Sequence, residues 1–303
     1  MKKTYLSILL SLLAHSLSAQ YQIGIIPRQS PDKGVYQKIG YTEVEIRYGS
    51  PAVKDRQIWG GIVPYGEVWR AGANYATSIH FASPVSINGS RLDSGSYTFF
   101  LIPREQDSWT AIFNKVAQQW GAFSYDPSED ALRLEVRARR SPFKTENLTY
   151  SITQTGFKFG SIMLHWEFME VEVPFETNYL TAFEQEVESR AKKQPDYIQW
   201  IPYLQGAEHL VQIEEAIPLA KVWINKAEKI MQANEEWNAQ FYPKPYVEGH
   251  LYWIKAQILA TEEKYADAIA YVDKLKGLDK QEFYLKKKET EGIDKHLQLW
   301  KTK

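Results

Sequence analysis

The chain has 303 residues, 36 basic and 37 acidic side chains, a formal net charge of −1 and no cysteine. This charge balance argues against nucleic-acid binding and against a strongly charged membrane partner. The lack of cysteine excludes disulfides, thiolate metal ligands, a cysteine nucleophile and a lipid anchor on an N-terminal cysteine. The length exceeds the usual size of a single hydrophobic core and therefore predicts two domains.

Residues 1–19 have the order of a secretory signal peptide. Two lysines follow the initial methionine, residues 5–14 form a mostly apolar run, and residues 16–19 are mostly small. This order is typical of signal peptides, and the apolar run is shorter than the ~20 residues that a transmembrane helix needs. We expect cleavage after Ala19 or after Ser18, and a soluble mature chain in the periplasm or outside the cell. A buried N-terminal helix is the alternative interpretation.

Residues 20–174 predict the first domain, which is rich in strands. Apolar and polar side chains alternate there, as in Val44, Ile46 and Tyr48, which are separated by Glu45 and Arg47. A period of two is typical of strands with one buried face. The alternation, or a shorter apolar run, recurs at residues 78–81, 97–102, 109–113, 132–136, 148–152 and 162–168. About eight strands with short turns predict an antiparallel β-sandwich or a β-barrel.

Two local features refine this β domain. Asn88-Gly89 lies between apolar residues and predicts a tight type I′ hairpin turn, because both residues tolerate a positive φ. In the last run the apolar phase shifts after Phe168, which predicts a β-bulge or an exit of the strand onto a different surface.

Residues 175–303 change to the periodicity of helices, which makes the chain α+β with a C-terminal helical-hairpin region. Apolar stripes lie at residues 180–191, 213–231, 246–260, 265–275 and 281–300. Pro218 must lie near a helix start or cause a kink. The small residues Ala256 and Ala268 let two helices approach closely, so residues 246–275 resemble one tetratricopeptide-type hairpin, with a weaker second copy around Ala216. A solenoid needs about three repeats, so these helices either form such an array or pack on the β domain.

The chain lacks the common catalytic motifs. It has no Gly-x-Ser-x-Gly elbow, no phosphate-binding Gly-Lys-Ser/Thr and no His-Glu-x-x-His zinc helix, which counts against the familiar hydrolases. His165 and Glu167 share the polar face of one predicted strand, where they form an acid/base pair, two metal ligands or, most simply, a solvated pair. No histidines have the i, i+3 or i, i+4 ligand spacing, and we predict no cofactor and no metal site.

One long segment, residues 59–74, combines features of a ligand site. Its four glycines let the backbone approach a ligand, and long ordered loops tend to be functional. A second loop, residues 120–126, has a similar aromatic and polar composition, and together the loops would bind a sugar, a peptide or an anion. Stacking surfaces and hydrogen-bonding groups come from the candidate ligand-binding residues Trp59, Tyr65, Glu67, Trp69, Arg70, Asn74, Trp120, Tyr125 and Asp126.

The same segment also has a structural interpretation. Its tryptophans would close the end of a barrel, its glycines would form turns, and a buried Arg70 would bind loop carbonyls while it pairs with Glu67. Replacing Arg70 by Ala separates the two interpretations. Loss of a buried partner of Glu67 would cost ~3 kcal/mol or more, whereas loss of a ligand-binding Arg70 would leave the melting temperature nearly unchanged.

The chain carries a series of ordered motifs, which begins with Ser50-Pro51, Ile58-Trp59-Gly60, Val63-Pro64-Tyr65-Gly66-Glu67-Val68-Trp69-Arg70, Gly72-Ala73-Asn74 and Ala76-Thr77. These motifs resemble an exported bacterial family called domain of unknown function 2911. The resemblance covers about residues 40–152 and includes Trp109-Thr110, the run 113–115 and the loop 120–125. Where the family carries Thr and Glu, this chain has Ala71 and Tyr75. The resemblance implies domain limits but no activity, substrate or catalytic residue.

The leading hypothesis is a non-enzymatic binding or scaffold protein of the cell envelope. The β domain would recognise a ligand or a partner through its aromatic loops, and the helices would add a second interaction surface for an envelope protein or a small ligand. The alternative is an envelope hydrolase acting on glycans or peptides, with Glu67, Asp126 or His165 as acid or base and with Arg70 and Asn74 positioning the substrate.

Overall fold

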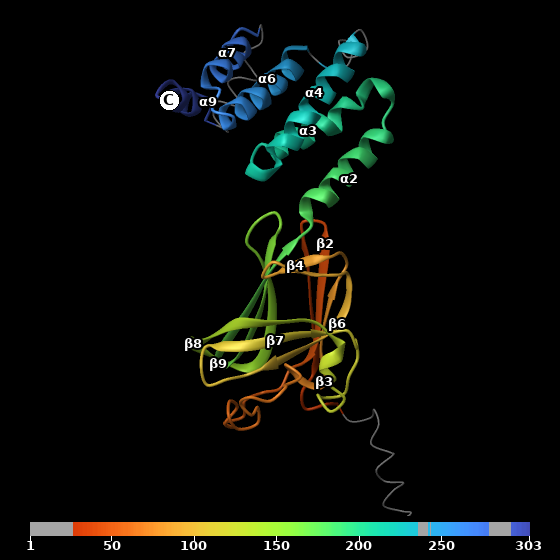
Figure 1. The fold of residues 1–303 in the computed structure, drawn as a ribbon, viewed down its shortest axis with the longest axis vertical. Coiled ribbons are helices and arrows are strands. Elements are labelled where there is room, and N and C mark those ends of the chain that lie inside the picture. Colours follow the sequence, from red (N-terminus) through yellow and green to blue (C-terminus); the bar gives the residue numbers. More distant parts are fainter. Residues whose placement is uncertain (1–26, 236–241, 243, 279–291) are drawn as a thin grey trace, which may run out of the picture. The chain divides into compact units, whose positions relative to one another are not determined.

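The computed structural model describes residues 27–235, 242, 244–278 and 292–303 (Figure 1). The predicted signal peptide and the first part of the predicted helix 281–300 lie outside these residues. The chain divides into two compact units between Tyr179 and Leu180. We call them the β unit and the helical unit.

The β unit is one antiparallel sheet, with the strand order β1-β2-β3-β6-β7-β8-β9-β4-β5. The alternation predicts its buried face correctly: Val44 and Ile46 are fully buried, and Glu43 and Arg47 are exposed. The nine strands are β1 (Asp32–Ile39), β2 (Thr42–Gly49), β3 (Ala73–Phe81), β4 (Val85–Ile87), β5 (Ser90–Leu92), β6 (Gly95–Ile102), β7 (Ser108–Asn114), β8 (Asp130–Gln154) and β9 (Phe159–Thr177).

This sheet curls on itself around one hydrophobic core. Strand β1 lies against both β8 and β9, although it is separated from them in the strand order. The two long strands make this possible, since β8 has 25 residues and β9 has 19. The predicted runs 132–136 and 148–152 are therefore two parts of β8 and not separate strands. The core that the sheet encloses extends from Ile39 to Phe175.

Bulges bend the long strands. The pairing of β8 with β9 shifts register between Arg140 and Thr149, opposite Glu167, which has a positive φ of 54°. The buried phase changes there from Trp166 to Val171, so the predicted bulge is confirmed but begins at Glu167 and not after Phe168. The predicted hairpin turn between β4 and β5 is also confirmed, with φ values of 50° at Asn88 and 77° in the next residue.

The helical unit follows directly after β9, which continues past Pro174 to Thr177. Pro218 is the second residue of α4, as expected for a proline that begins a helix. Helix α3 was not predicted, because Pro202 and Gly206 interrupt its sequence. The described α-helices are α2 (Tyr179–Lys192), α3 (Trp200–Leu210), α4 (Ile217–Ala233), α6 (Lys244–Thr261), α7 (Tyr265–Lys276) and α9 (Ile293–Lys301).

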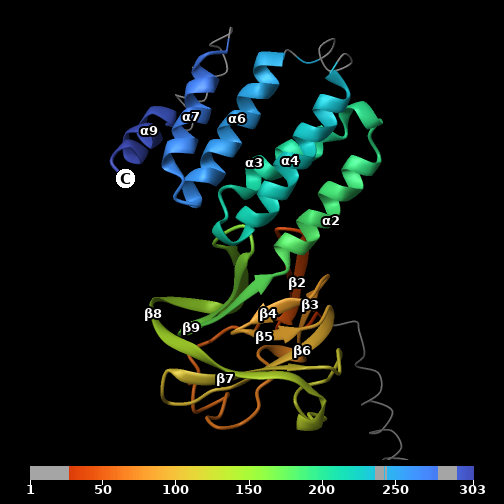
Figure 2. The same ribbon diagram turned by 45° about the horizontal axis from the view of Figure 1, so that its top comes forward.

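The helices pack as neighbouring pairs, with α3 beside α4 and α6 beside α7 (Figure 2). Ala256 and Ala268 are fully buried between α6 and α7, which allows these helices to approach closely. The unit has its own hydrophobic clusters, one around Trp223 and one around Trp253 and Trp300. None of the helices in the described ranges combines the length and the apolar character needed to cross a bilayer.

Candidate functional site

Two of the predicted stacking residues, Trp59 and Trp69, belong to the core of the β unit. Trp59 lies 4.9 Å from Trp109 of β7, and Trp69 stacks on Trp166 of β9 at 5.8 Å between ring centroids. Trp69 is only 9% exposed. The four tryptophans form one cluster of contacting rings, which agrees with the structural interpretation of Trp59 and Trp69.

The loop itself is fixed by backbone hydrogen bonds. Trp69 and Leu101 exchange two of them, at 2.8 and 2.9 Å, and the Gly60 N–H donates to the Val63 carbonyl at 2.9 Å. Gly60 has a φ of 72°, and a Cβ there would lie 2.8 Å from the Tyr65 ring. Tyr65 and Glu67 are exposed on this loop, so they are accessible and are not part of the core.

Arg70 lies half-buried and has no partner for its charge. Its Nε is buried without a hydrogen-bond acceptor, and no hydrogen bond or ion pair joins its side chain to a residue in the described part of the chain. Burial lowers the pKa of Arg70 from its ordinary value. The predicted pairing of Arg70 with Glu67 is therefore wrong: Glu67 is exposed, and solvent hydrates it more favourably than a half-buried contact would.

The backbone after Arg70 adopts unusual conformations. Ala71 and Asn74 have positive φ values of 51° and 62°, which are uncommon for residues other than glycine. The Ala71 carbonyl accepts hydrogen bonds from the Tyr150 hydroxyl at 2.8 Å and from Thr77 Oγ1 at 2.9 Å. Asn74 donates through Nδ2 to the Ser30 carbonyl at 3.0 Å. The turn is thus held by contacts from three separate parts of the chain.

An exposed pair of aromatic side chains follows this turn. Tyr75 and Trp120 bridge β3 and the second loop, and their ring centroids lie 4.9 Å apart in an edge-to-face arrangement. Tyr75 is 51% exposed and Trp120 is 53% exposed. Backbone hydrogen bonds on both sides hold them, from Ala76 to Gln119 at 2.9 Å and from Gly121 to Asn74 at 3.2 Å. We call Tyr75 and Trp120 the aromatic wall.

Arg28 covers part of the aromatic wall. The Cζ atom of its guanidinium lies 5.5 Å from the Tyr75 ring centroid and 5.7 Å from that of Trp120, within the range of cation–π contacts. The same side chain lies 3.3 Å from the Asp32 carboxylate. The wall therefore already accommodates a flat cationic group that belongs to the chain itself.

A groove of about 610 Å³ lies beside the aromatic wall. Tyr75 lines it, and so do charged side chains of both signs. Arg47 binds Glu45 at 2.8 Å, whereas Lys33 forms no ion pair with any residue that the structure describes. We call this the β-unit groove, and its charged lining residues are Arg28, Asp32, Lys33, Glu45 and Arg47. Three cations face two carboxylates, which leaves one positive charge for a ligand.

The other predicted residues of the second loop have local structural roles. Tyr125 donates to Asp130 Oδ2 at 2.7 Å and accepts from Arg133 at 3.0 Å. Burial, aided by the hydrogen bond to Asp130, raises the pKa of Tyr125 to about 12. Asp126 caps a short 3₁₀ turn by accepting from the Ser128 N–H at 2.9 Å, and the two hydrogen bonds from Ser128 lower the pKa of Asp126.

His165 faces Glu170 and not the predicted partner Glu167. Its Nδ1 lies 3.6 Å from Glu170 Oε1. Arg139 donates to the same carboxylate at 2.9 Å and, as the largest cause, lowers the pKa of Glu170. No group of three or more histidine and carboxylate side chains in the described ranges could hold a metal ion.

The structure thus places the nine predicted ligand-binding residues in different parts of the β unit. Only Trp120 and Asn74 lie at the aromatic wall and the turn next to it. The groove adds Lys33, Arg47 and Tyr75, which were not predicted as site residues. Lys33 lies on β1, a strand whose mostly exposed side chains give little alternation. Tyr75 was noted in the sequence only as an expected departure from the resembled family, and not as a site residue.

Comparison with known proteins gives one match. The family model "Protein of unknown function (DUF2911)" matches residues 30–175, which supports the resemblance for the β unit and agrees with the extent of its core. No curated protein and no solved structure matches the chain.

Proposed function

We propose that the protein is a non-enzymatic binding protein of the cell envelope, whose β unit recognises a ligand at the aromatic wall and the β-unit groove. The observation that carries this proposal is the aromatic wall itself. Its two rings are half-exposed, yet backbone hydrogen bonds on both sides hold them in place. Rigid aromatic side chains bind partners at a low cost in conformational entropy.

The charges of the groove suggest the chemistry of the ligand. Lys33 has no counterion among the described residues, and Arg47 and Arg28 lie on the same groove. The guanidinium of Arg28 shows that a flat group fits against the wall. We therefore assign to this site an envelope ligand that combines a flat or apolar face for Trp120 with an acidic group for Lys33.

Titration of the mature protein with a panel of acidic oligosaccharides and acidic peptides tests this assignment. Trp120 emits at a solvent-exposed site, so binding would change the intrinsic fluorescence. Trp120→Ala and Lys33→Ala should each weaken the binding at least tenfold. Phe143→Ala is the matched control, because Phe143 is an exposed aromatic residue that does not line the groove. Equal affinity of Trp120→Ala and the unchanged protein would refute the site.

Export and a second interaction surface belong to the same proposal. The signal-peptide order of residues 1–19 supports export, and N-terminal sequencing of the secreted protein would identify cleavage after Ser18 or Ala19. The close packing of α6 and α7 through Ala256 and Ala268 supports a tetratricopeptide-like hairpin as a surface for a partner protein. If the expressed protein stayed in the cytosol with its first residues intact, the envelope location would be wrong.

No observation favours the hydrolase interpretation. Asp126 is occupied in its cap, His165 contacts Glu170, and Glu67 is exposed on its loop. The decisive measurement is a turnover assay on envelope glycans and peptides with the mature protein. Hydrolysis that disappears in Glu67→Gln would replace the binding proposal with an enzymatic one.

A further inference from the structure

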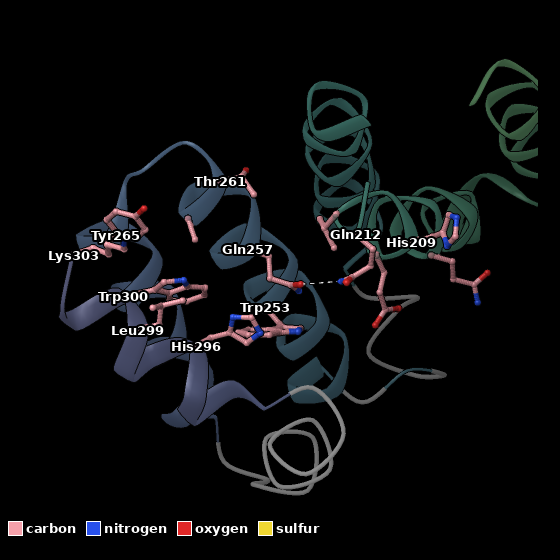
Figure 3. A pocket seen from close by; sticks show the side chains of 14 residues that line it. His209, Gln212, Trp253, Gln257, Thr261, Tyr265, His296, Leu299, Trp300 and Lys303 are labelled. Carbon is pink, nitrogen blue, oxygen red and sulfur yellow. Dashed lines mark hydrogen bonds between the residues drawn. The ribbon is translucent and has the colours of Figure 1, made fainter. Parts of the chain in front are cut away.

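The helical unit contains a groove of about 820 Å³, which we call the helical groove (Figure 3). Helices α3, α6, α7 and α9 contribute eleven of its fourteen lining residues, and Val211, Gln212 and Lys303 lie just beyond the ends of α3 and α9. Its volume lies within the ~300–1,000 Å³ typical of ligand pockets. The groove is independent of the β-unit groove, because no residue of the β unit lines it.

Amide side chains bridge the helical groove. Gln212 donates through Nε2 to Gln257 Oε1 at 3.2 Å, which joins the end of α3 to α6 (Figure 3). This single bond leaves the Gln257 NH₂ group and the Gln212 carbonyl oxygen for other partners. Gln205, an exposed residue of α3 seven positions before Gln212, adds a third amide to the lining.

Aromatic rings form another wall of the helical groove. The His296 ring lies 5.7 Å from both Trp253 and Trp300, and the two tryptophans lie 6.1 Å apart. The two tryptophans are buried but also line the groove, whereas His296 is exposed (Figure 3). Leu299, 54% exposed, adds an apolar contact next to them.

The groove is almost free of charge. Glu208 and Lys303 are the only lining residues with a permanently charged side chain, and the Glu208 carboxylate lies 3.3 Å from His250 Nδ1. His209 also lines the groove, and burial lowers its pKa, so that it stays neutral near pH 7. A strongly anionic or cationic ligand would find little charge to compensate its own.

From this geometry we infer that the helical groove binds a neutral oligosaccharide. Half of the fourteen lining residues carry a side chain that both donates and accepts hydrogen bonds. These are the three amides, two imidazoles, the Tyr265 hydroxyl and the Thr261 hydroxyl. Sugar hydroxyls have the same double capacity, and each sugar ring carries several of them.

A peptide fits this lining less well. An extended peptide offers one N–H and one C=O per residue, whereas each sugar ring offers several hydroxyls. A sugar therefore matches the donating and accepting capacity of the lining more fully. The apolar faces of sugar rings would instead pack on His296 and Leu299 while their hydroxyls bind the amides.

An array of neutral oligosaccharides from maltose, cellulose, chitin and mannan, probed with the full-length mature protein, tests this inference. The strongest hit is then titrated by calorimetry. Gln257→Leu and Gln205→Leu should each weaken binding at least tenfold. Gln232→Leu is the matched control, because Gln232 is an exposed amide on α4 that does not line the groove. Trp120→Ala should leave this affinity unchanged, which separates the result from the proposed function of the β unit.

Three results would overturn the inference. The first is that no neutral oligosaccharide binds. The second is binding that Gln257→Leu and Gln205→Leu leave intact although both variants fold, as judged by their circular dichroism. The third is binding of members of a random peptide library in this groove, lost in Gln257→Leu, without binding of any glycan on the array.

Discussion

We expect the replacement of Arg70 by Met to stabilise the protein, although the loss of an arginine next to the core usually destabilises a fold. The Arg70 Nε is buried without an acceptor among the described residues, and an unsatisfied buried donor costs ~1–3 kcal/mol. Met retains a flexible apolar chain of similar length and removes this cost. Part of the guanidinium remains hydrated, so the gain should be the smaller part of the range, about 1 kcal/mol.

Urea unfolding of the full chain, followed by far-ultraviolet circular dichroism, measures the change in the free energy of unfolding. In a thermal unfolding experiment, the same gain of about 1 kcal/mol should raise the melting temperature by ~2–4 °C for a unit of this size. Arg137→Met is the control, because Arg137 is exposed on β8 and such a change alters stability by ~0.5 kcal/mol or less. A loss of more than about 2 kcal/mol in Arg70→Met would refute the reasoning, since it would show that Arg70 serves a charged partner in the fold.

Three further results are expected. Trp166→Ala should lower the free energy of unfolding by ~3–5 kcal/mol, measured as a lower urea midpoint, because Trp166 is buried against Trp59 and Trp69; a loss below ~1 kcal/mol would contradict the packed cluster. With a folded pKa of about 12 for Tyr125 and an unfolded value of ~10, stability should fall as the pH rises from ~10 to ~12. Tyr125→Phe should reduce this alkaline loss, and an unchanged pH profile of the urea midpoint would disprove it. Gly206→Ala should destabilise the helical unit, because its Cβ would lie 2.6 Å from the Trp223 ring, whereas Ala at a permissive helical glycine stabilises by up to ~1 kcal/mol; an increase in melting temperature would contradict this clash.

Most of the secondary structure could be predicted from local patterns. The alternation of Val44 and Ile46 with polar residues identified β2, and Asn88-Gly89 identified the β4–β5 hairpin. Local sequence patterns failed where contacts between distant parts of the chain determine the secondary structure. Strand β1 exposes most of its side chains and is held by pairing with β2, so its sequence carries no strong periodicity. The continuity of β8 depends on bulges opposite Glu167, which no local pattern encodes.

The candidate site could be predicted only in outline. The sequence singled out the two aromatic loops, but composition does not distinguish a tryptophan that packs on a core from one that faces solvent. Trp59 and Trp120 occur in similar surroundings in the sequence, yet the first is partly buried and packs against Trp109 and Trp166 of the core. The partners of Trp120 are Tyr75 and Arg28, which lie 45 and 92 positions away in the numbering.

The difference between the residues that pack on the core and those that line the β-unit groove indicates what the motifs of the resemblance specify. Trp59, Trp69 and the glycines of the loop 50–69 build a rigid closure of the core, so their pattern follows from folding and carries no information about a ligand. The groove residues Lys33 and Arg47 lie outside the longest motif of the resemblance, and Tyr75 stands at a position where we expect the resembled family to carry Glu. A Glu at this position would replace a stacking surface for Arg28 with a carboxylate. The motifs of the resemblance therefore describe the scaffold, whereas the ligand recognition that we propose would depend on groove positions such as Lys33 and Tyr75.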